Sequence, residues 1–276
     1  YFAEKAEKFL YDPNSPVRNE LLYEEFLKGV LACKLVEPGK KAHFQYQFDF
    51  AQVVSGEYGQ WILSGLGVTL QISAVSIVLS LALGTMIAVM RLSKVKPLVW
   101  FAASFTEFFR NTPLLVQIFF WYFGSYSVLP EADNQWLYAR DFEFACGVIA
   151  LTFYTAAFIA EEIRSGIFSI PKNQLEASRA CGLSFLQAMA YVILPQAFRV
   201  IIPPLISQFL NLIKNSSLVM TIGVMDLTYM ARQIEAHTFH GFEAFTVATS
   251  IYLTISLVIS YSITLYNKRV LRTTSH

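Results

Sequence analysis

The clearest feature of the sequence is a series of apolar runs long enough to cross a lipid bilayer. A transmembrane helix needs about 20 mostly apolar residues, and five stretches approach that requirement. Charged residues lie in three of them: Glu107 and Arg110 in the second, Glu161, Glu162 and Arg164 near the end of the third, and Lys214 in the fourth. The pattern predicts an all-α transmembrane bundle of five helices, with approximate spans at 63–90, 98–129, 144–167, 200–224 and 244–266.

The segments between the runs alternate in charge. Basic residues gather in the turn after the first span (Arg91, Lys94 and Lys96), in the loop 169–199 and in the C-terminal tail, whereas the intervening loops are acidic. Because Lys and Arg concentrate in cytoplasmic loops, we expect the first span to start outside. The loop 169–199 and the C-terminus are then expected to be cytoplasmic.

Residues 1–58 precede the first span and hold seven basic against nine acidic residues, a net charge of −2. This charge balance predicts an extracytoplasmic location. We expect a mostly helical extension at 1–58, followed by a transmembrane domain at 59–270. Phe48 to Trp61 mixes aromatic and polar residues, which suits an interfacial helix. A long outer N-terminus needs a route across the membrane, so we expect a further transmembrane helix upstream of Tyr1.

Composition supports the membrane assignment. Hydrophobic residues make up 55% of the 276 residues and charged residues 15%, whereas soluble domains carry about 25% charged residues. With a net charge of +1, the chain lacks the overall excess of basic residues that is typical of nucleic-acid-binding proteins. The three cysteines include no Cys-x-x-Cys pair, so no disulfide framework is expected.

The usual catalytic and nucleotide-binding motifs are absent from the sequence. It contains no G-x-x-x-x-G-K-[ST] phosphate loop, no H-E-x-x-H and no G-x-S-x-G. If ATP drives this protein, another chain binds it. His237 and His240 are spaced to share one helical face, but a zinc site needs three or four protein ligands, so no metal site is expected.

The loop 169–199 has the composition of two short helices separated by a glycine. Leu175 to Cys181 favours a helix that Gly182 stops, and Ser184 to Val192 is a second amphipathic stretch that should end before Leu194 and Pro195. Such a pair can dock into a groove of a partner or lie on lipid headgroups. Periodicity alone favours the second alternative.

The residues of this loop carry a family resemblance. Glu176-Ala177-Ser178, then Gly182 and Leu194-Pro195, resemble the Glu-Ala-Ala loop of ABC importer permeases, with Ser178 in place of the third family residue. Further motifs resemble the polar amino-acid branch, either glutamate/aspartate or general L-amino-acid permeases, and stand in family order over roughly 60–270. They are the strings at 109–117, 154–167, 194–205 and 214–218.

The resemblance implies a type I ABC importer permease-like bundle that is a transport subunit and not an enzyme. The ATPase-coupling residues would be Glu176, Ala177, Ser178, Gly182, Leu194 and Pro195. The chain itself would carry no cofactor, since ATP and Mg would bind to a partner ATPase dimer. The other implied partners are a second permease, identical or related, a periplasmic amino-acid-binding protein and membrane lipid. The implied location is the bacterial inner membrane.

Polar residues within the predicted spans are the candidates for a substrate cavity, because lipid exposure of an ionisable group costs a few kcal/mol. Lys214 begins a polar patch with Asn215, Ser216 and Ser217. The alternative is a structural Lys214 paired with Glu161 or Glu107.

Arg110 and Gln117 complete the candidate set, and their spacing of seven residues predicts that they lie two turns apart on one helical face. The run Asn111-Thr112-Pro113 should break or kink the helix between them. Broken helices beside polar side chains often form midplane substrate sites, but Arg110 can equally snorkel to the interface.

Asn215 stands where several related permeases have Asp, which favours acidic or neutral amino acids over cationic ones. The rival function is an ATP-independent secondary transporter that uses Lys214, Arg110 and Glu161. A membrane enzyme is the least supported reading, because the sequence offers no nucleophile–base pair.

Overall fold

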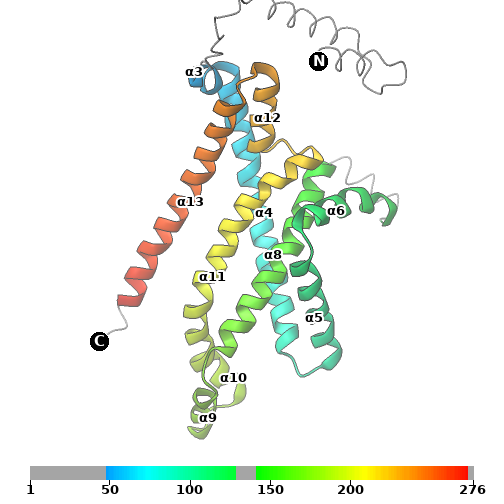
Figure 1. Ribbon diagram of the computed structural model, residues 1–276. Coiled ribbons are helices and arrows are strands. Elements are labelled where there is room, and N and C mark those ends of the chain that lie inside the picture. Colours follow the sequence, from blue (N-terminus) through cyan, green and yellow to red (C-terminus); the bar gives the residue numbers. More distant parts are fainter. Residues whose placement is uncertain (1–47, 129–140, 273–276) are drawn as a thin grey trace, which may run out of the picture. The chain divides into compact units, whose positions relative to one another are not determined.

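The computed structural model describes residues 48–128 and 141–272. The chain divides into two units, 1–47 and 48–276, so the predicted N-terminal helices lie outside the described residues. Every regular element within the described ranges is helical (Figure 1). In chain order these are α3 (Phe50–Val54), α4 (Gly56–Leu92), α5 (Lys96–Asn111), α6 (Leu114–Val128), α8 (Phe142–Phe168), α9 (Lys172–Ala180), α10 (Phe185–Ala188), the π-helix η1 (Met189–Ile193), α11 (Leu194–Asn215), the 3₁₀-helix η2 (Ser216–Ile222), α12 (Leu227–Thr238) and α13 (Gly241–Arg272).

Four of the described helical segments are long and apolar enough to cross a membrane: Gly56–Leu92, Phe142–Phe168, Phe185–Ile222 and Gly241–Tyr261. The predicted all-α membrane class is therefore confirmed, but the count of five spans is not. The stretch 98–129 is two helices, of which α6 contributes a shorter apolar segment, Leu114–Gly124.

The break between α5 and α6 lies where the sequence predicts it. The last residue of α5 is Asn111, and Thr112 at its C-cap has extended backbone angles. Pro113 has no backbone N–H and restricts the residue before it to extended conformations, so the helix cannot continue through it. The second predicted span consequently changes direction at this point (Figure 1).

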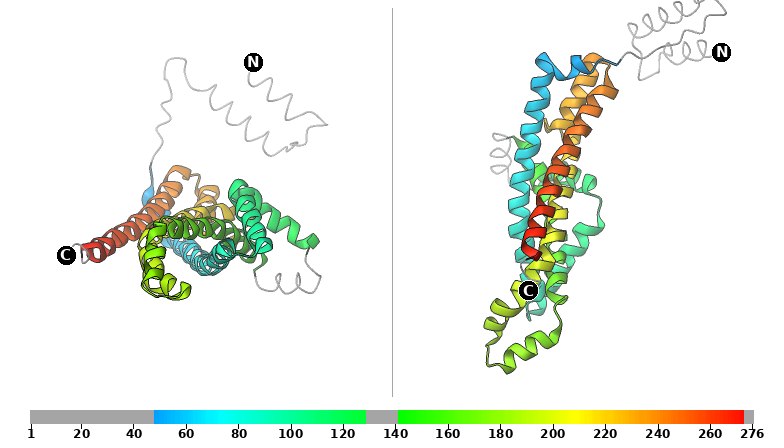
Figure 2. Two further views of the ribbon diagram at one scale, coloured as in Figure 1. Left: turned by 90° about the horizontal axis from the view of Figure 1, so that it is seen from below. Right: turned by 90° about the vertical axis from the view of Figure 1, so that its left-hand side faces the viewer.

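Helices α4 and α8 run side by side at the centre of the bundle (Figures 1 and 2). The buried positions Ser73, Ser76, Ser80 and Gly84 recur every three or four residues along one face of α4. At Gly84 an added Cβ would lie 2.7 Å from Cγ2 of Ile159 and 2.9 Å from the Ala156 carbonyl oxygen. Small residues thus let the two helices approach closely, as helices in membranes commonly do.

The second helix of the loop 169–199 does not end before Leu194 and Pro195, so that prediction is wrong. Helix α10 runs through the π-helical turn Met189–Ile193 directly into α11. The Leu194 N–H bonds to the carbonyl of Met189, five residues back. A widened π turn relieves the clash between a proline ring and the preceding turn, and this is how Pro195 is accommodated near the start of α11.

Helix α12, at the end of the bundle opposite α9 and α10 (Figure 1), is joined to α13 through its N-cap residue Asp226 and to α4 through Leu227. The buried carboxylate of Asp226 accepts hydrogen bonds from the Tyr229 N–H, at 2.9 Å, and from the Tyr252 hydroxyl of α13, at 3.1 Å. The next residue, Leu227, donates its N–H to the Thr69 hydroxyl of α4 at 3.0 Å. Burial raises the pKa of Asp226 to about 6.

The glycine contact on α4 predicts a position-specific loss of stability. Gly84→Ala should destabilise the folded protein by about 1–3 kcal/mol, because the new methyl group meets the α8 backbone. The matched control is Gly67→Ala on the same helix, where an added Cβ has nothing within 4 Å. Thermal unfolding of the detergent-purified protein measures the difference, and equal melting temperatures for the two variants would contradict the packing.

Asp226 predicts a pH dependence of stability. Its folded pKa of about 6 lies above the ordinary 3.8, so the folded protein holds this proton more tightly than the unfolded chain does. Stability should then rise as the pH falls from about 7 to about 4, by up to about 3 kcal/mol from this group. Asp226→Asn should remove that contribution from the melting temperature measured against pH, and superimposable profiles for native protein and variant would refute it.

Candidate functional site

A cavity of about 270 Å³ lies between α8 and α11. Its lining positions are spaced three and four residues apart on each helix, so they form one face of each. Tyr154, Thr155 and Phe158 come from α8, and the α11 side consists of Gln208, Asn211, Leu212 and Asn215. The cavity therefore sets amides opposite aromatic rings, a composition suited to a small ligand with an apolar body and polar ends.

Charged groups border this cavity. The guanidinium carbon of Arg110 lies 5.4 Å from the ring centroid of Phe158, a cation–π contact that brings the end of α5 to the cavity wall. The Gln208 side-chain amide donates to the Glu162 carboxylate at 3.4 Å. Of the predicted residues, Asn215 lines the cavity, and Arg110 contacts the lining residue Phe158.

Gln117 does not line this cavity. It is 4% exposed, and its side-chain nitrogen donates to the Phe109 carbonyl at 2.9 Å and to the Thr112 carbonyl at 3.1 Å. The prediction that Arg110 and Gln117 share one helical face is wrong, because the helix ends at Asn111 between them.

The four residues of the polar patch at 214–217 make different contacts. Lys214 is exposed and makes no ion pair with any residue in the described ranges. The hydroxyls of Ser216 and Ser217 donate to the carbonyls of Ile213 and Lys214, at 2.8 and 2.7 Å. Of this patch, only Asn215 lines the α8–α11 cavity.

Glu161 is paired with other cations, so the alternative of a Lys214–Glu161 pair is wrong. Its carboxylate lies 3.5 Å from the Arg91 guanidinium of α4 and also binds Arg164, one turn further along α8. The other proposed partner, Glu107, accepts instead from the Asn111 amide at 3.1 Å. The cluster of Arg91, Glu161 and Arg164 joins α4 to α8.

Tyr154, Phe158, Gln208 and Asn211 are cavity residues that the sequence reasoning did not single out. A signal for two of them was present, because Gln208, Asn211 and Asn215 recur at helical spacing in an otherwise apolar stretch. The aromatic pair on α8 gave no such signal, since aromatic residues are common throughout this chain.

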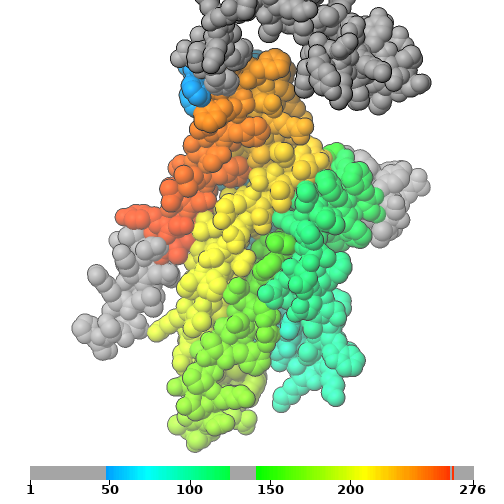
Figure 3. Space-filling model, in the orientation of Figure 1, coloured from blue at the N-terminus to red at the C-terminus, as the bar shows by residue number. Residues whose placement is uncertain are grey.

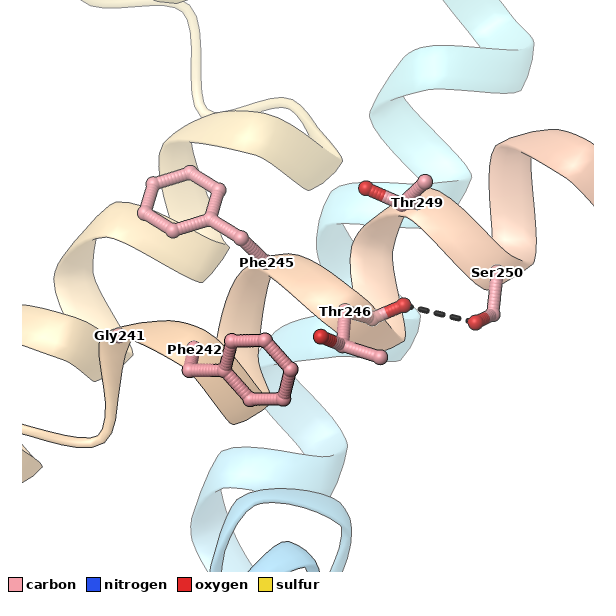
Figure 4. A pocket seen from close by; sticks show the side chains of 6 residues that line it. All are labelled: Gly241, Phe242, Phe245, Thr246, Thr249 and Ser250. Carbon is pink, nitrogen blue, oxygen red and sulfur yellow. Dashed lines mark hydrogen bonds between the residues drawn. The ribbon is translucent and has the colours of Figure 1, made fainter. Parts of the chain in front are cut away.

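A larger hollow of about 430 Å³ lies on α13 (Figure 4). All its lining residues come from that single helix and none is ionisable: Gly241, Phe242, Phe245, Thr246, Thr249 and Ser250. The Ser250 hydroxyl is already bonded to the Thr246 carbonyl, at 2.7 Å. A face of one helix without charge is a poorer candidate for binding a polar solute than the α8–α11 cavity.

The predicted coupling loop forms the two short helices expected for it, at one end of the bundle (Figures 1 and 3). Gly182 has a φ of +88°, the left-handed conformation that favours glycine after a helix. Ser184 caps the next helix in a reciprocal capping box with Gln187. The end of α9 and the start of α10 are therefore each defined by a residue typical of that position, Gly182 and Ser184.

The surface of this loop is partly apolar. Glu176 and Ala177 are exposed, whereas Ser178 is buried and donates its hydroxyl to the Leu175 carbonyl at 2.8 Å. Leu186 is 77% exposed and Tyr191 73% exposed. Two apolar side chains projecting from a well-defined helix pair are suited to contact with another surface.

Comparison with known proteins identifies the family. The model of the family described as "binding-protein-dependent transport system inner membrane component" matches residues 80–272. A second family model, of a domain of unknown function, matches residues 1–53.

Individual relatives agree with this match. The probable glutamine ABC transporter permease protein GlnM of Bacillus subtilis is 41% identical over 75% of this chain and 92% of its own length. The glutamate/aspartate import permease protein GltJ of Escherichia coli K12 is 35% identical over 77% of this chain and 88% of its own. Other relatives are named GlnP, GltK and the arginine permease ArtQ.

A solved structure described as an amino acid ABC transporter with histidines is 34% identical, with a TM-score of 0.72. The match covers 81% of this chain and all of that one. These likenesses disfavour the ATP-independent alternative. The chain is a multi-pass membrane protein and a transport component, not an enzyme, and it belongs to the family of binding-protein-dependent inner membrane components, the permease subunits of ABC transporters.

Proposed function

We propose that this chain is the permease subunit of an ATP-driven importer of polar L-amino acids, located in the bacterial inner membrane. The observation that carries the proposal is the α8–α11 cavity with Arg110 over its Phe158 wall. An amino acid presents a carboxylate that a guanidinium binds well. Its ammonium group and polar side chain can be taken up by the amides of Asn211 and Asn215.

The cavity favours acidic or neutral amino acids over cationic ones. Arg110 contributes a positive charge at its wall, and Asn215 contributes an amide where an Asp would contribute a negative charge. Glutamine and glutamate, the substrates in the names of GlnM and GltJ, fit this balance. The arginine named for ArtQ does not, although the overall identity of that relative is similar.

The energy comes from partner subunits. In this proposal the loop of Glu176, Ala177, Ser178 and Gly182, with Leu194 and Pro195 at the start of α11, docks onto a dimer of ATPase subunits that bind ATP and Mg. The exposed apolar side chains of Leu186 and Tyr191 support a contact with another surface at this loop.

Two further partners complete the assembly. A second permease, identical or related, encloses the translocation path together with this chain, and the relatives include the pairs GlnM and GlnP, and GltJ and GltK. A periplasmic binding protein delivers the amino acid. The basic loop 169–199 and the C-terminus then face the cytoplasm, and residues 1–58 face the periplasm.

Asn215→Asp tests the charge argument for the substrate. The added carboxylate should weaken binding of L-glutamate by about tenfold, that is by roughly 1.4 kcal/mol, and weaken L-glutamine less, because like charges repel in the partly buried cavity. Asn215→Ser is the matched control, since it removes the amide without adding charge. Equilibrium binding of each radiolabelled amino acid to the purified permease–ATPase complex gives the comparison. An unchanged preference between the two ligands would remove the charge argument.

Gly182→Val tests the coupling loop. A β-branched residue at a φ of +88° is strained, so the turn between α9 and α10 should distort. ATP-dependent amino-acid uptake into proteoliposomes should fall at least about tenfold while binding of the amino acid to the complex is retained. The control is Gly67→Val, which introduces the same side chain at an open position. Full uptake by the Gly182 variant would contradict a coupling role.

A further inference from the structure

Gln117 is a buried side chain whose hydrogen bonds all reach back across the α5–α6 break. Its nitrogen lies 2.9 Å from the Phe109 carbonyl oxygen, 3.1 Å from the Thr112 carbonyl oxygen and 2.7 Å from the Thr112 hydroxyl, and its two hydrogens are shared among these three acceptors. The side chain sits on α6, whereas its partners belong to the end of α5. It therefore links the two halves of the broken segment.

The break explains the need for such a donor. A helix leaves its last carbonyls without intrahelical partners, and Pro113 supplies no N–H. The Phe108 carbonyl accepts from the Thr112 hydroxyl at 2.9 Å. The Phe109 carbonyl, four residues before Pro113, receives its bond from Gln117. In apolar surroundings an unmet carbonyl costs several kcal/mol.

The Phe109 carbonyl lies in the peptide unit that also contains the Arg110 nitrogen, so Gln117 constrains the backbone at Arg110. The ring of Phe109 adds a second constraint. It stacks on Phe153 of α8 at 5.4 Å between centroids, and Trp121 of α6 stacks on the same ring at 5.1 Å. The final turn of α5 is thereby fixed against both α6 and α8. Arg110 is the charged residue that this turn presents to Phe158.

We infer that Gln117 is a positioning residue that holds Arg110 at the wall of the α8–α11 cavity, where its guanidinium takes the carboxylate of the substrate. The inference rests on the proposed function, because it requires an amino acid in that cavity. Gln117 touches neither the cavity nor the ligand. Its effect on affinity passes entirely through Arg110.

Gln117→Met is the informative variant, since methionine keeps the length of the side chain and removes the donor. A glutamate would confuse the test, because the side-chain oxygen of Gln117 is buried without a hydrogen-bond partner in the described part of the chain, and a carboxylate there would be an unpaired charge. Val116→Met is the matched control. It makes a similar replacement at the neighbouring position of α6, which is 57% exposed.

The experiment is a double-mutant cycle on the purified permease–ATPase complex, with equilibrium binding of radiolabelled L-glutamine and L-glutamate as the readout. Gln117→Met should weaken binding about tenfold, and Val116→Met should not. Arg110→Ala should weaken binding at least as much. In the Arg110→Ala background, Gln117→Met should cause no further loss, because the residue it positions is absent.

A second readout separates positioning from misfolding. Hydrogen exchange of the amides at 108–117 should accelerate in Gln117→Met, while exchange along α8 and the melting temperature of the complex change little. Additive losses in the cycle, or full affinity in Gln117→Met, would overturn the inference while leaving the proposed function standing. A native complex that binds neither amino acid would instead overturn the proposed function, and this inference with it.

Discussion

A backbone carbonyl inside an apolar helical bundle needs a hydrogen-bond donor, and at three irregular points of this chain a polar side chain donates to one. At the α5–α6 break the donor is Gln117. At the π turn before Pro195 the Gln196 side chain donates to the Val192 carbonyl at 2.8 Å. In the 3₁₀ turn after α11 the donors are the hydroxyls of Ser216 and Ser217. Polar side chains in these stretches thus support the backbone as well as any substrate.

These irregular points place the functional elements. The first brings Arg110 to the wall of the α8–α11 cavity, and the second carries the coupling loop into α11 without an interruption of the helix. Because α11 also supplies Asn211 and Asn215, one continuous helix connects the loop to the cavity. Close packing at Gly84 holds α8, which forms the other side of the cavity, against α4.

Hydropathy and motifs were enough to predict the helical class, the break at Pro113 and the glycine turn at Gly182, because each follows from local chemistry. The roles of Gln117, Ser216 and Ser217 were not predictable in this way. A polar residue in an apolar run has the same appearance whether it binds a ligand or a carbonyl, and only the contacts distinguish the two. The predicted ion pair of Lys214 with Glu161 was wrong for a related reason. Glu161 pairs with Arg91 across a helix–helix contact that periodicity does not reveal.

An amino acid that occupies the α8–α11 cavity should protect a cysteine placed there from a thiol reagent. Asn211→Cys, in a chain whose three native cysteines are replaced by serine, would be labelled in the assembled transporter, with Thr249→Cys on α13 as the control position. L-glutamine or L-glutamate should slow labelling at 211 and leave labelling at 249 unchanged. Equal labelling rates with and without these amino acids at position 211, in a transporter that still imports them, would contradict occupation of the cavity by the amino acid.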